Sequence, residues 1–218
     1  MKEKVVIYGI TEFAQFVFHY FKKDFNCEVV GFTVESKYLD KNSLNNLPVV
    51  PFEDIEKIYP NTEYSLFIAI GPTKMNKIRE QYFNMAKEKG YKLYNYISNS
   101  AILDSPIGEN NFITDQCIVN SGVKFGNNNM VYEQVIICVG ATIFDHNYIA
   151  PRAIIGTNCV VKNNIIIGMN SVIKTDVCIE NETLIGAQCY IAQNTLYKSV
   201  YGVKTSPMLG CVSDKVKV

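Results

Sequence analysis

The chain of 218 residues is long enough for one large or two small domains, and 48% of its residues are hydrophobic, so it can bury a proper core. Lysine and arginine balance aspartate and glutamate at 21 each, which argues against nucleic acid as the main partner because no basic excess is left to neutralise phosphates. No apolar run reaches the about eighteen residues of a membrane span, and the start, MKEKVVIYGI, has too short an apolar run for a signal peptide, so we expect a cytoplasmic protein without a membrane span.

The first hundred residues alternate short apolar runs with segments of helical periodicity. The apolar runs predict strands at residues 4–9, 28–33, 65–71 and 91–97. The predicted helices cover residues 13–23, 51–59 and 74–89, and Gly90 ends the last of them. Strands that alternate with helices predict a small parallel, Rossmann-like α/β sheet over residues 1–100.

Two glycine turns follow the first and third predicted strands, namely Gly9-Ile10-Thr11 and Gly71-Pro72-Thr73. In a parallel sheet, ligands bind beyond the carboxyl ends of the strands, and free amides at the next helix N-terminus can hold a phosphate. The spacing is not the full dinucleotide fingerprint, so a plain chain reversal is an equally good interpretation of both glycines.

From Ile107 to Met208 the sequence divides into seventeen six-residue units without a slip of phase, and fifteen of them open with Ile or Val. A period of six fits neither a helix nor a hairpin sheet, but it fits a parallel β-helix in which three units complete one triangular turn. The opening residue of each unit then points inward and stacks on the one three units later. The predicted inner columns are Ile107, Phe125, Ile143, Val161 and Ile179; Ile113, Val131, Ile149, Ile167 and Ile185; and Val119, Ile137, Ile155, Ile173 and Ile191.

The fifth residue of each unit is often small, which suits a second inward position close to a corner. Cys117, Cys159 and Cys189 take this position, the seven cysteines form no CxxC, and only two histidines occur. We therefore expect buried structural thiols and neither a disulfide framework nor a metal site. Asn and Gly cluster at the second to fourth positions, where corners call for residues that tolerate a left-handed backbone.

Residues 98–106 connect the sheet to the coil without a flexible linker, and residues 209–218 have no period. We therefore expect an N-terminal domain at 1–100, a β-helix domain at 101–208 and a C-terminal tail at 209–218, with the two domains packed firmly together.

The strand, turn and helix at the start, the segment IAIGPTKMNKIREQYFNMAKEKGYKLYNYISNSA and the six-residue units together resemble the bacterial sugar acyltransferases of the hexapeptide-repeat superfamily, of the sialic-acid and bacillosamine type. The similarity covers almost the whole chain. It implies a homotrimer of left-handed β-helices with active sites between neighbouring subunits. It also implies transfer of an acetyl group from acetyl-CoA to an amino group, sometimes a hydroxyl, on a nucleotide-linked sugar used in glycan biosynthesis.

The resemblance also implies the binding residues. It assigns the nucleotide sugar to the front domain, at Gly9, Ile10, Thr11, Gly71, Pro72 and Thr73. The family usually places an acidic residue after the second strand to hold the base; here Thr33 and Val34 come first, and Glu35 is the candidate for this role. Acyl-CoA is expected along the later coils, at Gly168, Met169, Gly186 and Ala187.

The family generally places a histidine at the third position of a unit, where it deprotonates the acceptor amine. By alignment of the units this position is Val139, followed by Gly140, and a further family histidine aligns with Tyr148. The usual base is therefore expected to be replaced.

Three interpretations of this replacement are open. The enzyme can work without the base, at a loss of about 10²–10⁴-fold, because a sugar amine that titrates near neutrality is partly unprotonated already. His146, with Asp145 before it, can supply a substitute base, although it falls on a different wall from Val139, and a surface-exposed corner histidine is the plainer interpretation. The chain can also be a catalytically silent homologue that serves as a binding or assembly subunit.

Three further side chains have both a functional and an ordinary interpretation. Glu133 could orient an amine and Arg152 could hold a phosphate, but each can equally be a solvated charge. His19 lies within the first predicted helix, where packing or solvent exposure is expected.

Overall fold

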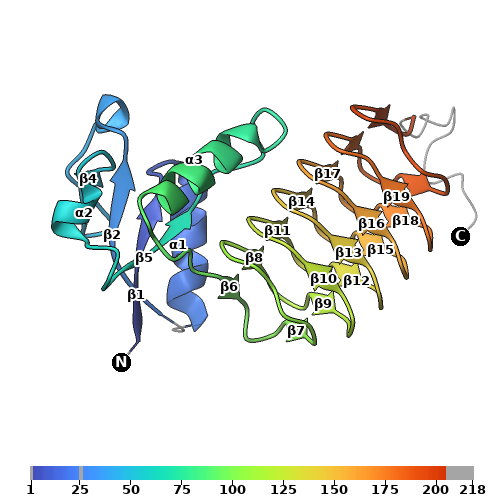
Figure 1. The fold of residues 1–218 in the computed structure, drawn as a ribbon, viewed down its shortest axis with the longest axis horizontal. Coiled ribbons are helices and arrows are strands. Elements are labelled where there is room, and N and C mark those ends of the chain that lie inside the picture. Colours follow the sequence, from blue (N-terminus) through green and yellow to red (C-terminus); the bar gives the residue numbers. More distant parts are fainter. Residues whose placement is uncertain (1, 25–26, 205–218) are drawn as a thin grey trace, which may run out of the picture.

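The structure, a computed structural model, describes residues 2–24 and 27–204 and contains two parts that pack directly against each other (Figure 1). The N-terminal part is a five-stranded sheet flanked by helices, and the C-terminal part is a left-handed β-helix with three parallel sheets. The predicted fold class is confirmed. The tail expected at residues 209–218 lies outside the described residues.

The front sheet has the strand order β3-β4-β2-β1-β5. Its strands are β1 (Glu3–Tyr8), β2 (Cys27–Val34), β3 (Ser43–Leu44), β4 (Leu47–Pro51) and β5 (Ser65–Ile68). β1 pairs in parallel with β2 and β5, and β2 pairs in parallel with β4, whereas β3 runs antiparallel to β4. This hairpin was not predicted from the sequence; Asn45 (φ 51°) and Asn46 (φ 62°) form its tight turn.

The helices of the front part are α1 (Glu12–Asp24), the 3₁₀ turn η1 (Ser36–Tyr38), α2 (Ile55–Ile58) and α3 (Lys77–Glu88). α1 forms where predicted, because its buried residues Ala14, Val17, Phe18 and Phe21 recur at helical spacing. The helix expected at 51–59 is shorter, and α3 begins later than expected. Its start is delayed because residues 74–76 all have left-handed backbone.

The segment at 91–97 was wrongly predicted as a fourth strand of the front sheet. Leu93 makes only a single parallel bridge to Leu66, and β6 (Tyr96–Ile97) pairs instead with β8 in the coil. The chain therefore leaves the front sheet within this segment. The domain boundary at residue 100 stays a prediction, with β6 lying on one side of it and β7 (Ile102–Leu103) on the other.

Each side of the coil is one parallel sheet of two-residue strands. The first sheet contains β10 (Lys124–Phe125), β13 (Thr142–Ile143), β16 (Val160–Val161) and β19 (Cys178–Ile179). The second contains β6, β8 (Phe112–Ile113), β11 (Met130–Val131), β14 (Tyr148–Ile149), β17 (Ile166–Ile167), β20 (Leu184–Ile185) and β22 (Val200–Tyr201). The third contains β7, β9 (Ile118–Val119), β12 (Ile136–Ile137), β15 (Ile154–Ile155), β18 (Val172–Ile173) and β21 (Tyr190–Ile191).

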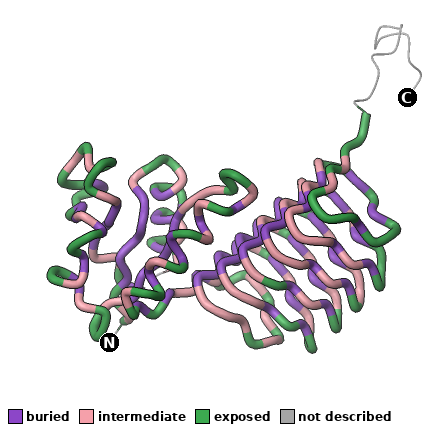
Figure 2. Tube along the Cα trace, turned by 45° about the horizontal axis from the view of Figure 1, so that its top comes forward, coloured by how far each residue is buried: buried purple, intermediate pink, exposed green. Residues whose placement is uncertain are grey.

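The predicted inner columns are confirmed, since their members pair three units apart along each sheet and form one buried core (Figure 2). Ile107, at the open end, is half-buried and packs against this core through its bridge to Phe125. The small fifth positions, including Cys117, Cys159 and Cys189, are also buried. The phase does slip in the last turn, because Tyr201, and not Val203, lies beside Ile185.

The fourth residue of every unit from 107 to 190 has a left-handed backbone, and only Gly122 and Gly140 among them are glycines. Asn occupies this position at 110, 128, 158, 164 and 170, and Gln at 116, 134 and 188. The corners therefore rely on side chains that tolerate this conformation, as predicted.

α1 and α3 hold the front part against the coil. The Tyr20 ring of α1 lies 5.4 Å from that of Phe112, and its hydroxyl donates a hydrogen bond to Glu133 at 2.7 Å. Arg79 of α3 is fully buried and donates to the carbonyl oxygens of Asn128 at 3.3 Å and Asn147 at 3.0 Å. Firm packing of the two parts is confirmed.

Candidate active site

A cleft of about 790 Å³ lies at the carboxyl ends of β1 and β5. Gly9, Ile10 and Thr11 line it from the turn after β1, and Gly71 and Thr73 line it from the turn after β5. Because both strands run in parallel, their two turns meet at one edge of the sheet. The structure therefore brings the two predicted glycine turns together.

The two glycines have different roles in the cleft. Gly9 has φ +121°, and a Cβ there would lie 2.9 Å from the carbonyl oxygen of Ala69, so the fold requires glycine. A Cβ at Gly71 would meet nothing within 4 Å. Gly71 therefore leaves room in the cleft without being needed for the turn itself.

The N-terminus of α1 adjoins the same cleft, since Thr11 and Phe13 line it and the Thr11 carbonyl accepts the first helical hydrogen bond, from Gln15, at 3.1 Å. The unpaired amides of the first turn and the helix dipole make such a terminus attractive to an anion. The cleft can therefore hold a phosphate at this end.

Glu35 takes part in the cleft only indirectly. Its Oε2 accepts a hydrogen bond from Tyr82 at 2.6 Å and an ion pair from Lys37 at 2.8 Å, and both of these partners line the cleft. The hydrogen bond from Lys37, followed by that from Tyr82, lowers the pKa of the Glu35 carboxyl below its usual value. The sequence analysis missed Lys37 and Tyr82, together with Tyr38 and Asp40, although three of these four follow β2 closely.

His146 is buried, with 9% of its surface exposed, so the exposed-corner interpretation is wrong. α3 covers this corner of the coil. The imidazole packs edge-on against the Phe83 ring at 5.5 Å, its Nδ1 lies 2.8 Å from Nδ2 of Asn128, and its Nε2 lies 4.0 Å from Oε1 of Glu80. Burial lowers the pKa of His146 below its usual value, so the imidazole is neutral at pH 7.

A polar pocket of about 370 Å³ lies next to His146, between α3 and the coil. Its charged walls are Glu80 and Lys77 from α3, and Asp145 and Glu182 from the coil. Three carboxylates against one lysine give the lining a net negative charge, which suits a cationic or amine-bearing ligand. Glu80 and Lys77 were not predicted as site residues, because the charged face of an amphipathic helix does not indicate whether it contacts solvent or another domain.

Of the predicted catalytic side chains, Asp145 and His146 share one corner and line the polar pocket, whereas Glu133 lies at another corner, as does Val139 at the usual base position. His146 follows β13 of the first sheet, Glu133 follows β11 of the second, and Val139 follows β12 of the third, so they occupy three different corners. Asp145 makes no hydrogen bond to the imidazole. Its Oδ1 instead accepts a hydrogen bond from the backbone amide of Asn127 at 2.6 Å.

Glu133 and Arg152 both have partners in the coil or its neighbouring helix. Glu133 is held by the hydroxyl of Tyr20, and the Nε of Arg152 donates to the side-chain oxygen of Gln134 at 3.0 Å. Both side chains are thus engaged in local contacts.

The residues expected to bind acyl-CoA lie in two successive turns of the coil. The amide of Gly168 donates to Ile185 at 2.7 Å and that of Gly186 to Tyr201 at 2.8 Å, so both amides belong to the coil ladder. A Cβ on Gly168 would come within 2.4 Å of Ala187, which explains the glycine by backbone contact. Met169 is 52% exposed.

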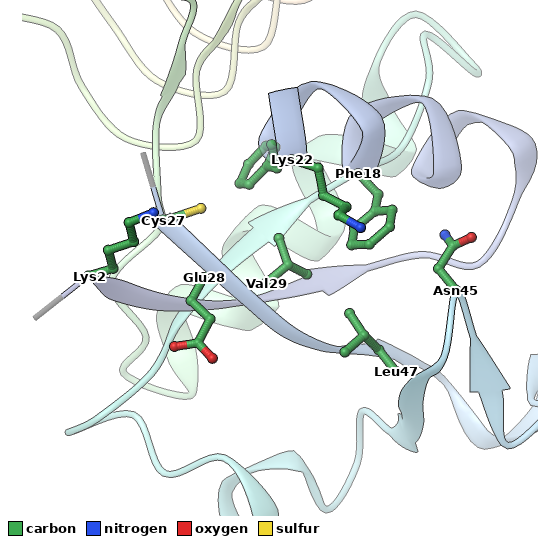
Figure 3. Close-up of a pocket in the computed structure, with 9 residues that line it drawn as sticks. Lys2, Phe18, Lys22, Cys27, Glu28, Val29, Asn45 and Leu47 are labelled. Carbon is green, nitrogen blue, oxygen red and sulfur yellow. The ribbon is translucent and has the colours of Figure 1, made fainter. Parts of the chain in front are cut away.

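A further cavity, of about 400 Å³, lies at the opposite end of the front sheet (Figure 3). Phe18, Val29 and Leu47 form its apolar wall, with Lys22 and Glu28 nearby. It opens beside the amino end of β2, whereas ligands of parallel sheets bind at the carboxyl ends. The cleft is therefore the stronger candidate site.

Among the described residues, no group of three or more His, Cys, Asp or Glu side chains is placed to hold a metal ion. Within residues 2–24 and 27–204, no helix combines the length and apolar character needed to cross a bilayer.

No protein-family model matches the sequence, and a search of curated proteins finds no match. Solved structures do match. The acetyltransferase domain of PglB from Neisseria gonorrhoeae FA1090 has a TM-score of 0.79 at 17% identity, over 91% of this chain and 95% of that one. A mutant of perosamine N-acetyltransferase from Caulobacter crescentus with one histidine replaced by asparagine, in complex with CoA and GDP-perosamine, has a TM-score of 0.76 at 18% identity, over 88% and 89%. WeeI from Acinetobacter baumannii AYE has a TM-score of 0.75 at 21% identity, over 92% and 95%.

The chain shares its fold with sugar N-acetyltransferases. The matches extend over the front sheet and the β-helix alike, so the resemblance noted in the sequence is confirmed for the fold of both parts. At 17–21% identity the matches establish the fold and not the chemistry.

Proposed function

We propose that this chain is an acyl-CoA-dependent N-acyltransferase, with acetyl-CoA as the donor, that acts on a nucleotide-linked amino sugar in bacterial glycan biosynthesis. The proposal rests on the cleft formed by the turns after β1 and β5. The front part that contains this cleft packs directly against a β-helix. The perosamine enzyme that shares this arrangement was solved with CoA and GDP-perosamine, which supports the same pair of ligand classes here.

The nucleotide is proposed to lie in the cleft, with its diphosphate at the N-terminus of α1 and the Gly9 and Gly71 turns. Tyr38, which is 56% exposed, offers an aromatic surface at the cleft, where Lys37 and Asp40 add one charge of each sign. The turn at 71–76 and the first residue of α3 connect the two cavities, because Thr73 lines the cleft and Lys77 lines the polar pocket. The sugar can thus extend past this turn, so that its amine enters the negatively charged pocket.

The donor is proposed to lie along the later coils, with its thioester at the polar pocket and the rest of the molecule extending towards Met169 and Ala187. We also propose a homotrimer in the cytoplasm, with the exposed apolar side chains of Val139 (51%) and Phe144 (44%) covered by neighbouring copies. No metal is required for attack of an amine on a thioester.

The function is tested by release of free thiol from acetyl-CoA in the presence of a panel of nucleotide-linked amino sugars. Turnover with at least one acceptor is expected. Binding without turnover for every acceptor would instead support the catalytically silent homologue.

The position of the nucleotide is tested by Gly71→Leu, which adds bulk to the cleft at a position where a Cβ meets nothing. We expect nucleotide affinity to fall at least tenfold with an unchanged unfolding midpoint. Gly202→Leu is the matched control, because a Cβ there also meets nothing within 4 Å but lies at the far end of the coil. Equal nucleotide affinity in both variants would show that the nucleotide does not bind in the cleft.

A further inference from the structure

A chain of hydrogen bonds runs along the coil corner beneath α3 and begins in the front sheet. The backbone amide of Ile68 donates to Oδ1 of Asn110 at 2.8 Å. Nδ2 of Asn110 donates to Oδ1 of Asn128 at 2.8 Å. Nδ2 of Asn128 then lies 2.8 Å from Nδ1 of His146. The two Asn side chains are fully buried, so water does not compete for these bonds.

The first bond of this chain fixes the direction of all the others. A backbone amide can only donate, so Asn110 must turn its oxygen to Ile68 and its NH₂ group to Asn128. Asn128 must then present oxygen to Asn110 and its NH₂ group to His146. Nδ1 of His146 is therefore the acceptor, and in the neutral ring the hydrogen is carried by Nε2.

A histidine held in this tautomer cannot take a proton from a substrate in the polar pocket, because Nδ1 is occupied and Nε2 has no free lone pair. The Nε2–H group instead points towards Oε1 of Glu80, at 4.0 Å. Oε2 of Glu80 accepts a hydrogen bond from Asn164 at 2.9 Å. Among the described residues, no donor lies within hydrogen-bond distance of Oε1, so this oxygen can receive an incoming N–H.

Resting on the acyl transfer proposed above, we propose that Glu80 is the proton acceptor of the polar pocket and that Asn128 is a positioning residue that holds His146 as the Nε2–H tautomer. Glu80 is then a catalytic residue and His146 is not the base. The negative lining of the pocket favours entry of the acceptor's amino group, and the hydrogen bond from Asn164 holds the Glu80 carboxylate in place for it.

The amine nitrogen attacks the carbonyl carbon of the acyl thioester, a C–N bond forms, and the C–S bond breaks with its electron pair leaving on sulfur as the CoA thiolate. The proton lost by nitrogen passes to Oε1 of Glu80 and from there to the thiolate, so the products are the amide and the free thiol of CoA. Glu80 returns to its carboxylate form.

The tautomer can be measured without any assay of activity. The chain has only two histidines, so a long-range ¹H–¹⁵N spectrum of histidine-labelled protein shows two rings, and His146→Asn identifies which is which. We expect the His146 ring to carry its hydrogen on Nε2. Asn128→Asp replaces the donor NH₂ group with an acceptor oxygen, and we expect it to move the hydrogen to Nδ1. A wild-type ring protonated at Nδ1 would overturn the positioning role of Asn128.

The proton acceptor is tested by Glu80→Gln, which keeps an acceptor for Asn164 but removes the carboxylate. We expect kcat to fall by about 10²-fold or more, the range of a lost general base, with the histidine spectrum still that of a folded protein. Glu88→Gln is the matched control, since Glu88 is an exposed residue of the same helix. Retention of wild-type kcat in Glu80→Gln, or a loss in His146→Asn as large as that in Glu80→Gln, would overturn the assignment.

The two proposals fail in different ways. If no nucleotide amino sugar is acylated by the wild type, the proposed function and the role of Glu80 fall together, while the spectrum still decides the tautomer. If the wild type turns over but Glu80→Gln is unaffected, only the proton acceptor is wrong.

Discussion

The guanidinium of Arg79 connects three segments of backbone at the domain junction, donating to the carbonyls of Ile70, Asn128 and Asn147. Burial lowers the pKa of Arg79 to about 10, so it remains charged at pH 7. Arg79→Met removes a buried donor from all three carbonyls, of which that of Asn147 still accepts the Met130 amide at 2.9 Å, and we expect the free energy of unfolding in urea to fall by about 3 kcal/mol or more. Lys87→Met, which removes only the half-exposed pair with Glu109, should change it by less than about 1 kcal/mol. Equal effects would show that Arg79 does not join the domains.

The burial of His146 predicts a dependence of stability on pH. Because its pKa is lowered in the folded state, the unfolded chain binds a proton at this site first as the pH falls below about 6.5. The free energy of unfolding should therefore decrease on acidification from pH 7 towards pH 5, by at most about 1.4 kcal/mol per pH unit from this group.

His146→Asn should remove the part of the pH dependence of stability that His146 contributes. Urea unfolding at several pH values measures this change. Asn fits the site, since Asn128 and Asn164 occupy the same corner position with φ 57° against 62° for His146. Parallel pH profiles for the variant and the wild type would contradict the account.

Within the coil, glycine is required where successive turns touch through their backbones. A Cβ at Gly168 would lie 2.4 Å from the amide nitrogen of Ala187, so Gly168→Ala must push two turns apart. We expect a loss of about 3 kcal/mol in the free energy of unfolding, against less than about 0.5 kcal/mol for Gly202→Ala. Unfolding in urea followed by circular dichroism measures both, and an unaffected Gly168→Ala would mean that the turns are not in contact there.

The coil could be predicted to the level of individual columns because its period is local: each unit repeats the inward aliphatic, the small fifth residue and the left-handed corner. The front sheet was harder to predict from the sequence. The segment 91–97 is apolar enough for a strand, but its partner changes from Leu66 to the coil within four residues. The Asn45-Asn46 turn was a usable hairpin signal that the sequence analysis overlooked.

The candidate site, too, could be predicted from the sequence only in part. The two glycine turns follow strands directly, so their meeting in one cleft follows from a parallel sheet. The burial of His146 and the role of Glu80 depend on α3 lying over one particular corner of the coil, and neither residue's sequence neighbours encode that contact.

At the scale of the whole molecule, the proposed trimer predicts a solution mass of three 24.6 kDa chains by light scattering. The physical reason is the exposed apolar surface of the coil, including Val139 and Phe144, which a single chain leaves uncovered. A concentration-independent monomer would contradict the proposed trimer.

In the proposed function, the two parts act together as an N-acyltransferase on a nucleotide-linked amino sugar. The most direct measurement is mass spectrometry of each candidate acceptor after incubation with the purified protein and acetyl-CoA. We predict that at least one acceptor gains a single acetyl group on its amino nitrogen, with one free CoA formed per acceptor modified. Recovery of every acceptor unmodified, with acetyl-CoA intact, would contradict the account.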